Sequence, residues 1–232
     1  MKVALKLKHL APDLWMMTFP LTVLGVDLQR NVTILKLSSG KLVIHSTAPF
    51  TPADVEVIHK LGEPAWLADV LLRHDTFAAQ GHAAFPQACY LAPDGFEAEG
   101  VTTLPLVPAP DEWAGEVEVA PIMGAPAFSE IVMLHRASRT LIVGDLLFNF
   151  EGTQDLLTKV FLKVGAVGGK HDPGMTRPFR NAIEDEAAFA DSIRGILEWD
   201  FDRVIVGHGV PIRTGGKEKL RATFHDAGIA GL

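Results

Sequence analysis

The sequence contains one cysteine, Cys89, among its 232 residues. A lone cysteine cannot form an internal disulfide, and it cannot supply the several thiolates of a structural zinc site. Cys89 lies in an apolar segment typical of a strand, where a structural thiol is more common than a nucleophile. The chemistry of this protein must therefore be sought in other side chains.

Basic residues are too few to balance the acidic ones. The 21 Lys and Arg against 28 Asp and Glu give a net charge of −7. Because nucleic-acid backbones are recognised by basic surfaces, this balance argues against a nucleic-acid-binding protein. No apolar run reaches the roughly 18 residues of a membrane-spanning helix, and no secretory signal pattern is present. We therefore expect a cytoplasmic protein that acts on a small molecule and binds neither nucleic acid nor membrane.

The sequence also lacks internal repeats, and its hydrophobic content is not low. A hydrophobic share of 48% excludes intrinsic disorder. The chain has no repeat and no linker-like stretch, so we expect one domain, 1–232, although its length also fits two small domains. A homodimer remains open, since it is a common state of soluble proteins.

Strand and helix patterns alternate along the chain. Residues 31–37 and 41–45 predict a hairpin, and a helix follows with Thr51 as its cap and Pro52 in its first turn. Further strands are predicted at 68–72, around Cys89, and at 101–106, 115–121, 131–134, 140–143 and 204–206. Further helices are predicted at 75–84, 153–164, 181–199 and 217–227. This order indicates an α/β fold in which two sheets pack face to face with helices outside.

Several apolar strands end directly in a side chain that can bind a metal. They end at His45, His74, Asp145 and His208, and a glycine precedes the last two. Taken singly, a His or Asp after a strand is usually a turn residue that bonds nearby backbone. The recurrence of this pattern at four strands indicates a metal site, because imidazole and carboxylate groups at converging strand ends are the ligands of divalent metals.

Two of these strand ends resemble a known family. The segment Thr140-Leu-Ile-Val-Gly-Asp145-Leu-Leu-Phe-Asn149 is followed later by Val204-Ile-Val-Gly-His208-Gly209. Together they resemble the metallo-β-lactamase-fold superfamily, in which a strand ending in Gly-Asp supplies a bridging aspartate and a later Gly-His supplies the last histidine ligand. The resemblance spans residues 10–225 and implies a four-layer αββα sandwich of two mixed sheets flanked by helices.

The sequence departs from the H-x-H-x-D-H signature of that superfamily. After the first histidine, the remaining ligand positions hold Thr76, Ala78 and Ala79. Residues 122–126 lack the next expected histidine, and residues 45–47 read His-Ser-Thr where the family has Asp-Thr-Gly. The family's metal ligands therefore have three counterparts here: His74, Asp145 and His208.

Three protein ligands and an open position for water describe a catalytic zinc site. The resemblance thus implies a mononuclear site for a divalent metal, with zinc expected, iron or manganese as alternatives, and an empty site left open. Asp75 is the candidate that orients the water. Substitute ligands could come from Asp75, His82 or His171, although surface positions are more common for such histidines. Arg177 and Arg180 could bind a substrate anion, but pairing with Glu184 or Asp185 is the stronger expectation.

Three functions follow. The first is a metal-dependent hydrolase in which metal-activated water attacks an ester, thioester, lactam or phosphodiester. The second is a catalytically inactive member of the fold that binds a ligand or partner, favoured by the residues at positions 76, 78 and 79. The third is an iron-dependent redox protein, since two histidines and a carboxylate suit ferrous iron.

Overall fold

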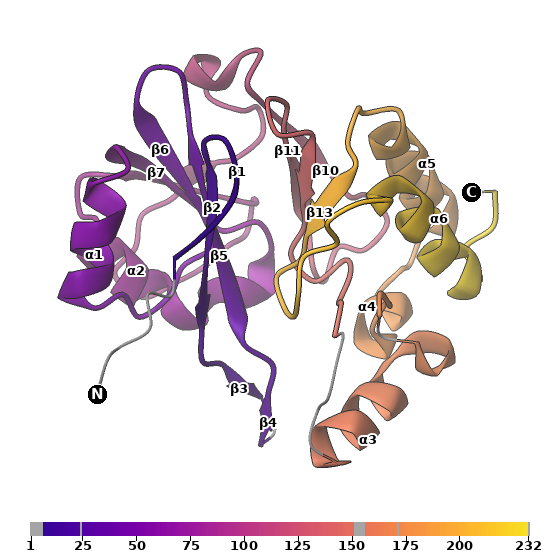
Figure 1. Ribbon diagram of the computed structural model, residues 1–232. Helices are drawn as coiled ribbons and strands as arrows, with labels where there is room; N and C mark the ends of the chain where they lie inside the picture. Colours follow the sequence, from indigo (N-terminus) through magenta and orange to yellow (C-terminus); the bar gives the residue numbers. More distant parts are fainter. Residues whose placement is uncertain (1–6, 24, 151–155, 171, 232) are drawn as a thin grey trace.

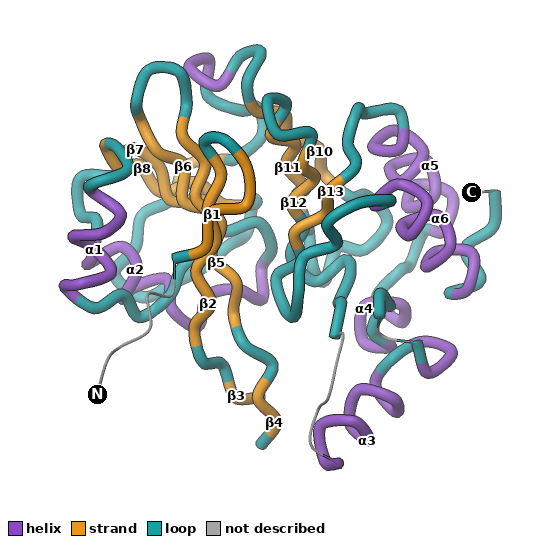
Figure 2. Tube along the Cα trace, in the orientation of Figure 1, coloured by secondary structure: helices purple, strands orange, loops and turns teal. Residues whose placement is uncertain are grey.

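The structure, a computed structural model, describes residues 7–23, 25–150, 156–170 and 172–231. Two β-sheets lie face to face, with helices covering their outer faces (Figure 1). Figure 2 shows the same four layers, with α1 and α2 outside one sheet and α5 and α6 outside the other. The predicted α/β sandwich of two mixed sheets is confirmed.

The first sheet has seven strands in the order β1-β2-β5-β6-β7-β8-β9. Their bounds are β1 (Lys8–Ala11), β2 (Leu14–Phe19), β5 (Arg30–Lys36), β6 (Lys41–His45), β7 (Glu63–Ala68), β8 (Cys89–Ala92) and β9 (Leu104–Pro105). The strands from β1 to β6 pair antiparallel, whereas those from β6 to β9 pair parallel. A separate two-stranded ribbon consists of β3 (Thr22–Val23) and β4 (Val26–Asp27).

The second sheet has four strands in the order β10-β11-β12-β13. Their bounds are β10 (Val117–Pro121), β11 (Ile131–His135), β12 (Thr140–Ile142) and β13 (Arg203–Ile205). The first three pair antiparallel, and β13 lies parallel to β12. Parallel pairing brings the C-terminal ends of β12 and β13 to the same edge, so the loops that follow them are neighbours.

Most of the described helices pack on the two outer faces. The described helices are α1 (Pro52–His59), α2 (Ala78–Ala84), α3 (Leu156–Gly165), α4 (Arg177–Asn181), α5 (Glu186–Leu197) and α6 (Gly216–Asp226), with the 3₁₀ turns η1 (Leu72–Phe77), η2 (Asp111–Trp113) and η3 (Val167–Gly169). Of these, α3 instead contacts β4 and η3. No helix in the described ranges is long and apolar enough to cross a membrane.

Alternation along β5 divides the apolar core between the layers. Val32 and Ile34 pack with Ile58 of α1 and Ala78 of α2 in one cluster. Leu35, on the opposite face, belongs to the cluster between the sheets, which extends to α5 and α6. Successive strand side chains point to opposite faces, so one strand serves both clusters.

The hairpin and the cap of the first helix are confirmed. β5 and β6 pair antiparallel as predicted. Thr51 Oγ1 accepts a hydrogen bond from the Asp54 backbone N–H, and the Asp54 carboxylate accepts one from the Thr51 N–H at 2.9 Å. This reciprocal capping box is worth about 1 kcal/mol at a helix start.

Several predicted boundaries are wrong. The strand expected at 68–72 lies earlier, at Glu63–Ala68, despite Pro64, and residues 72–77 form a 3₁₀ turn rather than the start of a helix. The strand expected at 101–106 is reduced to Leu104–Pro105, in which Pro105 has no N–H to donate to the ladder. The helix expected at 181–199 is shorter: α5 begins at Glu186 with Asp185 as its cap and ends at Leu197, and Asn181 is the last residue of α4. The first residues of the helix expected at 153–164 lie outside the described ranges.

Candidate metal centre

Asp145 lies three residues beyond the end of β12, on a loop held by a buried carboxyl group. Glu130 is 1% exposed and accepts hydrogen bonds from the backbone N–H groups of Gly144, at 2.8 Å, and Asp145, at 2.9 Å. Burial, and next the charge of Asp145, raise the pKa of Glu130 to about 8, while those backbone bonds oppose the rise. The Glu130 side chain therefore fixes the path of the loop that presents Asp145.

His208 follows β13 on the neighbouring loop, and the two loops touch. The Gly207 N–H donates to the Gly144 carbonyl at 3.0 Å, and a Cβ on Gly207 would lie 2.7 Å from that oxygen. The glycines before the two candidate ligands thus permit the close approach of the two loops. Within the His208 ring, Nδ1 lies 2.5 Å from the Gln29 carbonyl, to which it donates. That bond leaves Nε2 of a neutral imidazole with its lone pair free to bind a metal.

His74 reaches the same point from η1, where its backbone departs from helical geometry (φ −99°, ψ 20°). The side chain is buried, and burial followed by the charge of Arg30 lowers the pKa of His74 to about 4, although Asp145 opposes this. The imidazole is therefore neutral near pH 7, which is the form that binds metal ions.

The three side chains converge on one point. His74 Nε2 lies 3.3 Å from Asp145 Oδ1, and His208 Nε2 lies 3.2 Å from the same oxygen. One ligand atom from each residue falls within 4.8 Å of the others. Burial alone would raise the pKa of the Asp145 carboxyl, but the two histidines hold it below its usual range. An ionised oxygen thus faces two imidazoles, an arrangement that favours a cation between them.

The two separations that involve Asp145 fit a tetrahedral metal. Zinc bonds of about 2.0–2.1 Å place neighbouring ligand atoms about 3.3–3.4 Å apart. Both measured contacts to Asp145 agree with this spacing to about 0.2 Å. The side chains present therefore suit one divalent ion.

An apolar pocket of about 270 Å³ opens beside Asp145. Its apolar walls include Leu28, Phe128, Phe148, Leu162, Ala166 and Met175. Phe148 stacks on the His208 ring, with centroids 5.3 Å apart and planes 13° from parallel. Among the described residues, two cations line the pocket: Lys170 pairs with Asp226, whereas Arg73 lies over the Phe128 ring at 4.8 Å. The pocket thus combines an apolar body with one cation available to an anionic group.

A second set of polar side chains is buried near the candidate metal centre. Arg30 Nη1 donates to Ser46 Oγ at 2.9 Å, and the hydroxyls of Thr47 and Tyr90 donate to Asp69. Burial, followed by the charge of His74, lowers the pKa of His45, the fourth strand-end residue, to about 3. Within the described residues His45 is not part of the three-ligand cluster.

The remaining candidates lie elsewhere. Asp75 is exposed on η1, and its role in orienting water stays a prediction. His82 packs against Tyr90 at a centroid distance of 6.0 Å, and His171 lies outside the described residues. The expected pairing of Arg180 with Glu184 or Asp185 is wrong: Arg180 pairs at 2.5 Å with Glu186, in the first turn of α5. Arg177 donates to the Ala166 carbonyl at 3.3 Å.

Sequence reasoning missed two side chains that support the centre, Glu130 and Asn31. The Asn31 amide donates to the carbonyls of Val206, at 2.9 Å, and Gly209, at 2.8 Å, and so holds the loop of His208 against β5. A polar residue inside an apolar strand pattern is the one signal that could have indicated Asn31.

Replacing Glu130 by alanine is expected to weaken both the fold and the metal centre. Two buried backbone N–H groups would lose their acceptor, at about 1–3 kcal/mol each in the free energy of unfolding. Metal affinity is expected to fall about 10- to 100-fold, as when supporting groups of a metal site are removed. Urea unfolding and metal titration measure the two effects. Glu118→Ala, a partly exposed site on β10, is the control, and equal losses in both variants would contradict this role.

Comparison with known proteins identifies the fold. No protein-family model matches the sequence, and no curated protein matches it significantly. Among solved structures, the DIM-1 metallo-β-lactamase is similar over 97% of both chains, with a TM-score of 0.65 and 17% identity. The mono-zinc form of metallo-β-lactamase FIM-1 from Pseudomonas aeruginosa gives 0.64 and 13%, over 96% of this chain and 94% of that one. A metallo-β-lactamase from Hirschia baltica gives 0.62 and 15%, over 95% and 96%.

These similarities show that the chain has the metallo-β-lactamase fold. The resemblance drawn from the two strand ends is thereby confirmed at the level of the fold.

Proposed function

We propose that the protein is a metal-dependent hydrolase with a mononuclear site formed by His74, Asp145 and His208. The observation that carries the proposal is the pair of 3.2 and 3.3 Å contacts from two imidazole nitrogens to one carboxylate oxygen. FIM-1, a metallo-β-lactamase of the same fold, has been crystallised in a mono-zinc form. Zinc is the proposed metal, and iron and manganese are the alternatives.

A metal ion bound there would supply a water of lowered pKa and polarise the bond to be cleaved. Several groups of this chain hold the proposed metal ligands in position. The Gln29 carbonyl fixes the His208 tautomer, Glu130 fixes the loop of Asp145, and Phe148 shields the His208 ring from water. Asp75 is proposed to orient the attacking water.

The pocket beside Asp145 favours a particular kind of substrate. Its walls are apolar, and Arg73 is the cation left for an anionic group. An apolar acyl group joined through an ester or thioester suits these walls better than a phosphodiester, which would need more cations. We therefore propose an acyl ester or thioester with a carboxylate near its apolar part.

The experiment is a comparison of hydrolysis before and after chelation. Acyl esters and thioesters with and without a terminal carboxylate, together with a phosphodiester, are offered to the purified protein. The expected result is turnover of the carboxylate-bearing acyl compounds, lost on chelation and restored by zinc. Turnover that survives complete removal of metal would refute a metal-dependent hydrolase.

The absence of ligand-type side chains at Thr76, Ala78 and Ala79 favours a second candidate. A catalytically inactive protein of this fold could bind an apolar anion in the same pocket. This alternative predicts that such compounds raise the melting temperature without being hydrolysed, whether or not metal is present.

A further inference from the structure

A second hollow lies apart from the metal centre, where the edges of the two sheets meet. Its volume is about 910 Å³, within the range of about 300–1,000 Å³ typical of ligand sites. One wall comes from β1, the edge strand of the first sheet, and the other from β13, the edge strand of the second, with the loop after it. None of His74, Asp145 and His208 is among the residues that line it.

The charged side chains lining this basic groove are all cationic. They are Lys8, Arg203, Arg213 and Lys219, and no described acidic residue lines it. Four cations gathered in one hollow contrast with a net charge of −7 for the whole chain. Like charges repel one another, so such a concentration favours binding of an anion.

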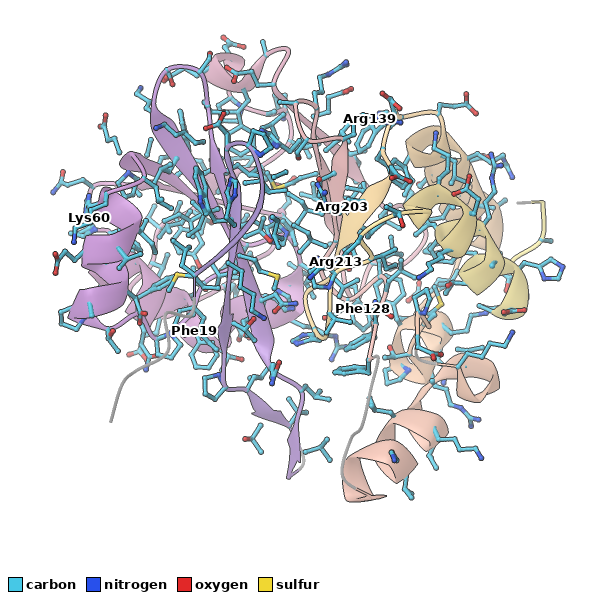
Figure 3. The ribbon with its side chains drawn as sticks, viewed as in Figure 1. Phe19, Lys60, Phe128, Arg139, Arg203 and Arg213 are labelled. Carbon is cyan, nitrogen blue, oxygen red and sulfur yellow. The ribbon has the colours of Figure 1, made fainter. Side chains whose placement is uncertain are left out.

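The two arginines are placed to bind an anion with several oxygens. Arg203 Nη1 donates to Thr140 Oγ1 at 3.2 Å and to the Ser138 carbonyl at 3.4 Å, which fixes the guanidinium. Within the described residues, no ion pair engages Arg203 or Arg213. Figure 3 shows both arginines on the viewed face, between the two sheets. A guanidinium binds phosphate oxygens in pairs, which a lysine cannot do.

The groove also has an apolar part. Leu10, Met16, Val210 and Pro211 line it, and Val210 is 40% exposed. His9 lines it as well and packs against Trp15 with ring centroids 5.7 Å apart, adding a flat surface. Met16 is itself buried, so the apolar surface open to a ligand is that of Val210 and the half-buried Leu10 and Pro211. A bare inorganic anion would leave this surface in water, whereas a ligand with an apolar or aromatic portion would cover it.

We propose that the basic groove binds a phosphate-bearing organic anion of about nucleotide size. Its phosphates contact Arg203 and Arg213, with Lys8 adding charge, and its organic part lies on Val210 and the neighbouring apolar side chains. The ligand's negative charge offsets the repulsion between the two arginines and Lys8. This site is independent of the metal centre and of the hydrolase proposal.

Calorimetric titration with ATP, inorganic tripolyphosphate and an acidic hexapeptide tests the proposal. The expected result is one ATP per chain, bound more tightly than tripolyphosphate and more weakly as salt rises. Arg213→Glu is expected to raise the Kd for ATP at least about tenfold. Arg221→Glu makes the same charge change at an exposed position outside the groove, and its Kd should stay within about twofold of the parent. His208→Ala should bind ATP as the parent does.

Four results would overturn the proposal. If ATP does not bind, the groove is not a binding site for it. If Arg213→Glu and Arg221→Glu weaken ATP binding equally, the attraction is diffuse and not specific to the groove. Loss of ATP binding in His208→Ala would place ATP at the metal centre. Tighter binding of the hexapeptide or of tripolyphosphate than of ATP would assign the groove to another class of ligand.

Discussion

Replacing His208 by alanine is expected to lower hydrolysis by at least about a thousandfold. In the proposed hydrolase, a bound metal would contribute several kcal/mol to stabilising the transition state, and each 1.36 kcal/mol corresponds to about tenfold in rate. Without His208, the remaining ligands are His74 and Asp145, which are too few to hold an ion at a defined position. Steady-state kinetics on the best acyl substrate measures the loss.

His225→Ala is the matched control for this variant. The His225 side chain is 82% exposed on α6, outside the metal centre, so its removal should leave the rate within about twofold of the parent. Circular dichroism and a melting curve check that the His208 variant is folded. A folded His208→Ala protein with the parent's rate would show that hydrolysis does not depend on this centre.

Gly209→Ala is expected to destabilise the protein by about 2–6 kcal/mol and to displace His208. Gly209 has φ +99°, a conformation that costs an alanine about 1–3 kcal/mol. A Cβ there would also lie 2.1 Å from the Asn149 carbonyl oxygen, a backbone atom that cannot move aside cheaply. Overpacking of this kind adds about 1–3 kcal/mol. Urea unfolding measures the loss of stability, and metal titration measures the effect on the adjacent ligand.

The variant Gly95→Ala separates the cost of backbone strain from the cost of overpacking. Gly95 also has a positive φ, +84°, but nothing lies within 4 Å of its added Cβ. Its cost should therefore be limited to about 1–2 kcal/mol of backbone strain, with no change in metal binding. If Gly209→Ala cost no more than Gly95→Ala, the close approach of Gly209 and Asn149 would not be a constraint on the fold.

The sequence indicated Asp145 and His208 because each follows a short apolar strand and a glycine. Such strands are buried on both faces, and buried strands pair in parallel more readily than exposed ones. Parallel pairing of β12 with β13 brought the two ends together, as the pattern implied. His74 was chosen from the same strand-end pattern and from the resemblance, but the apolar run before it is not a strand: β7 ends at Ala68, and His74 lies in a 3₁₀ turn.

The supporting side chains could not be predicted in the same way. Glu130 and Asn31 act on backbone groups far along the chain: Asn31 binds the carbonyls of Val206 and Gly209. Contacts of this kind depend on tertiary packing and leave no periodic signal. The error at 68–72 has a similar origin, because Pro64 lies in β7 beside an irregularity in the register with β6, where a proline is tolerated.

The metal content of the purified protein tests the central claim most directly. The protein is loaded with zinc, freed of unbound ions and measured by elemental analysis beside Asp145→Asn, which keeps the size of the side chain and removes its charge. Convergence of His74, Asp145 and His208 predicts about one zinc per chain in the parent and almost none in the variant. A parent protein that retains no zinc, iron or manganese, or an Asp145→Asn variant that retains the full content, would contradict the claim.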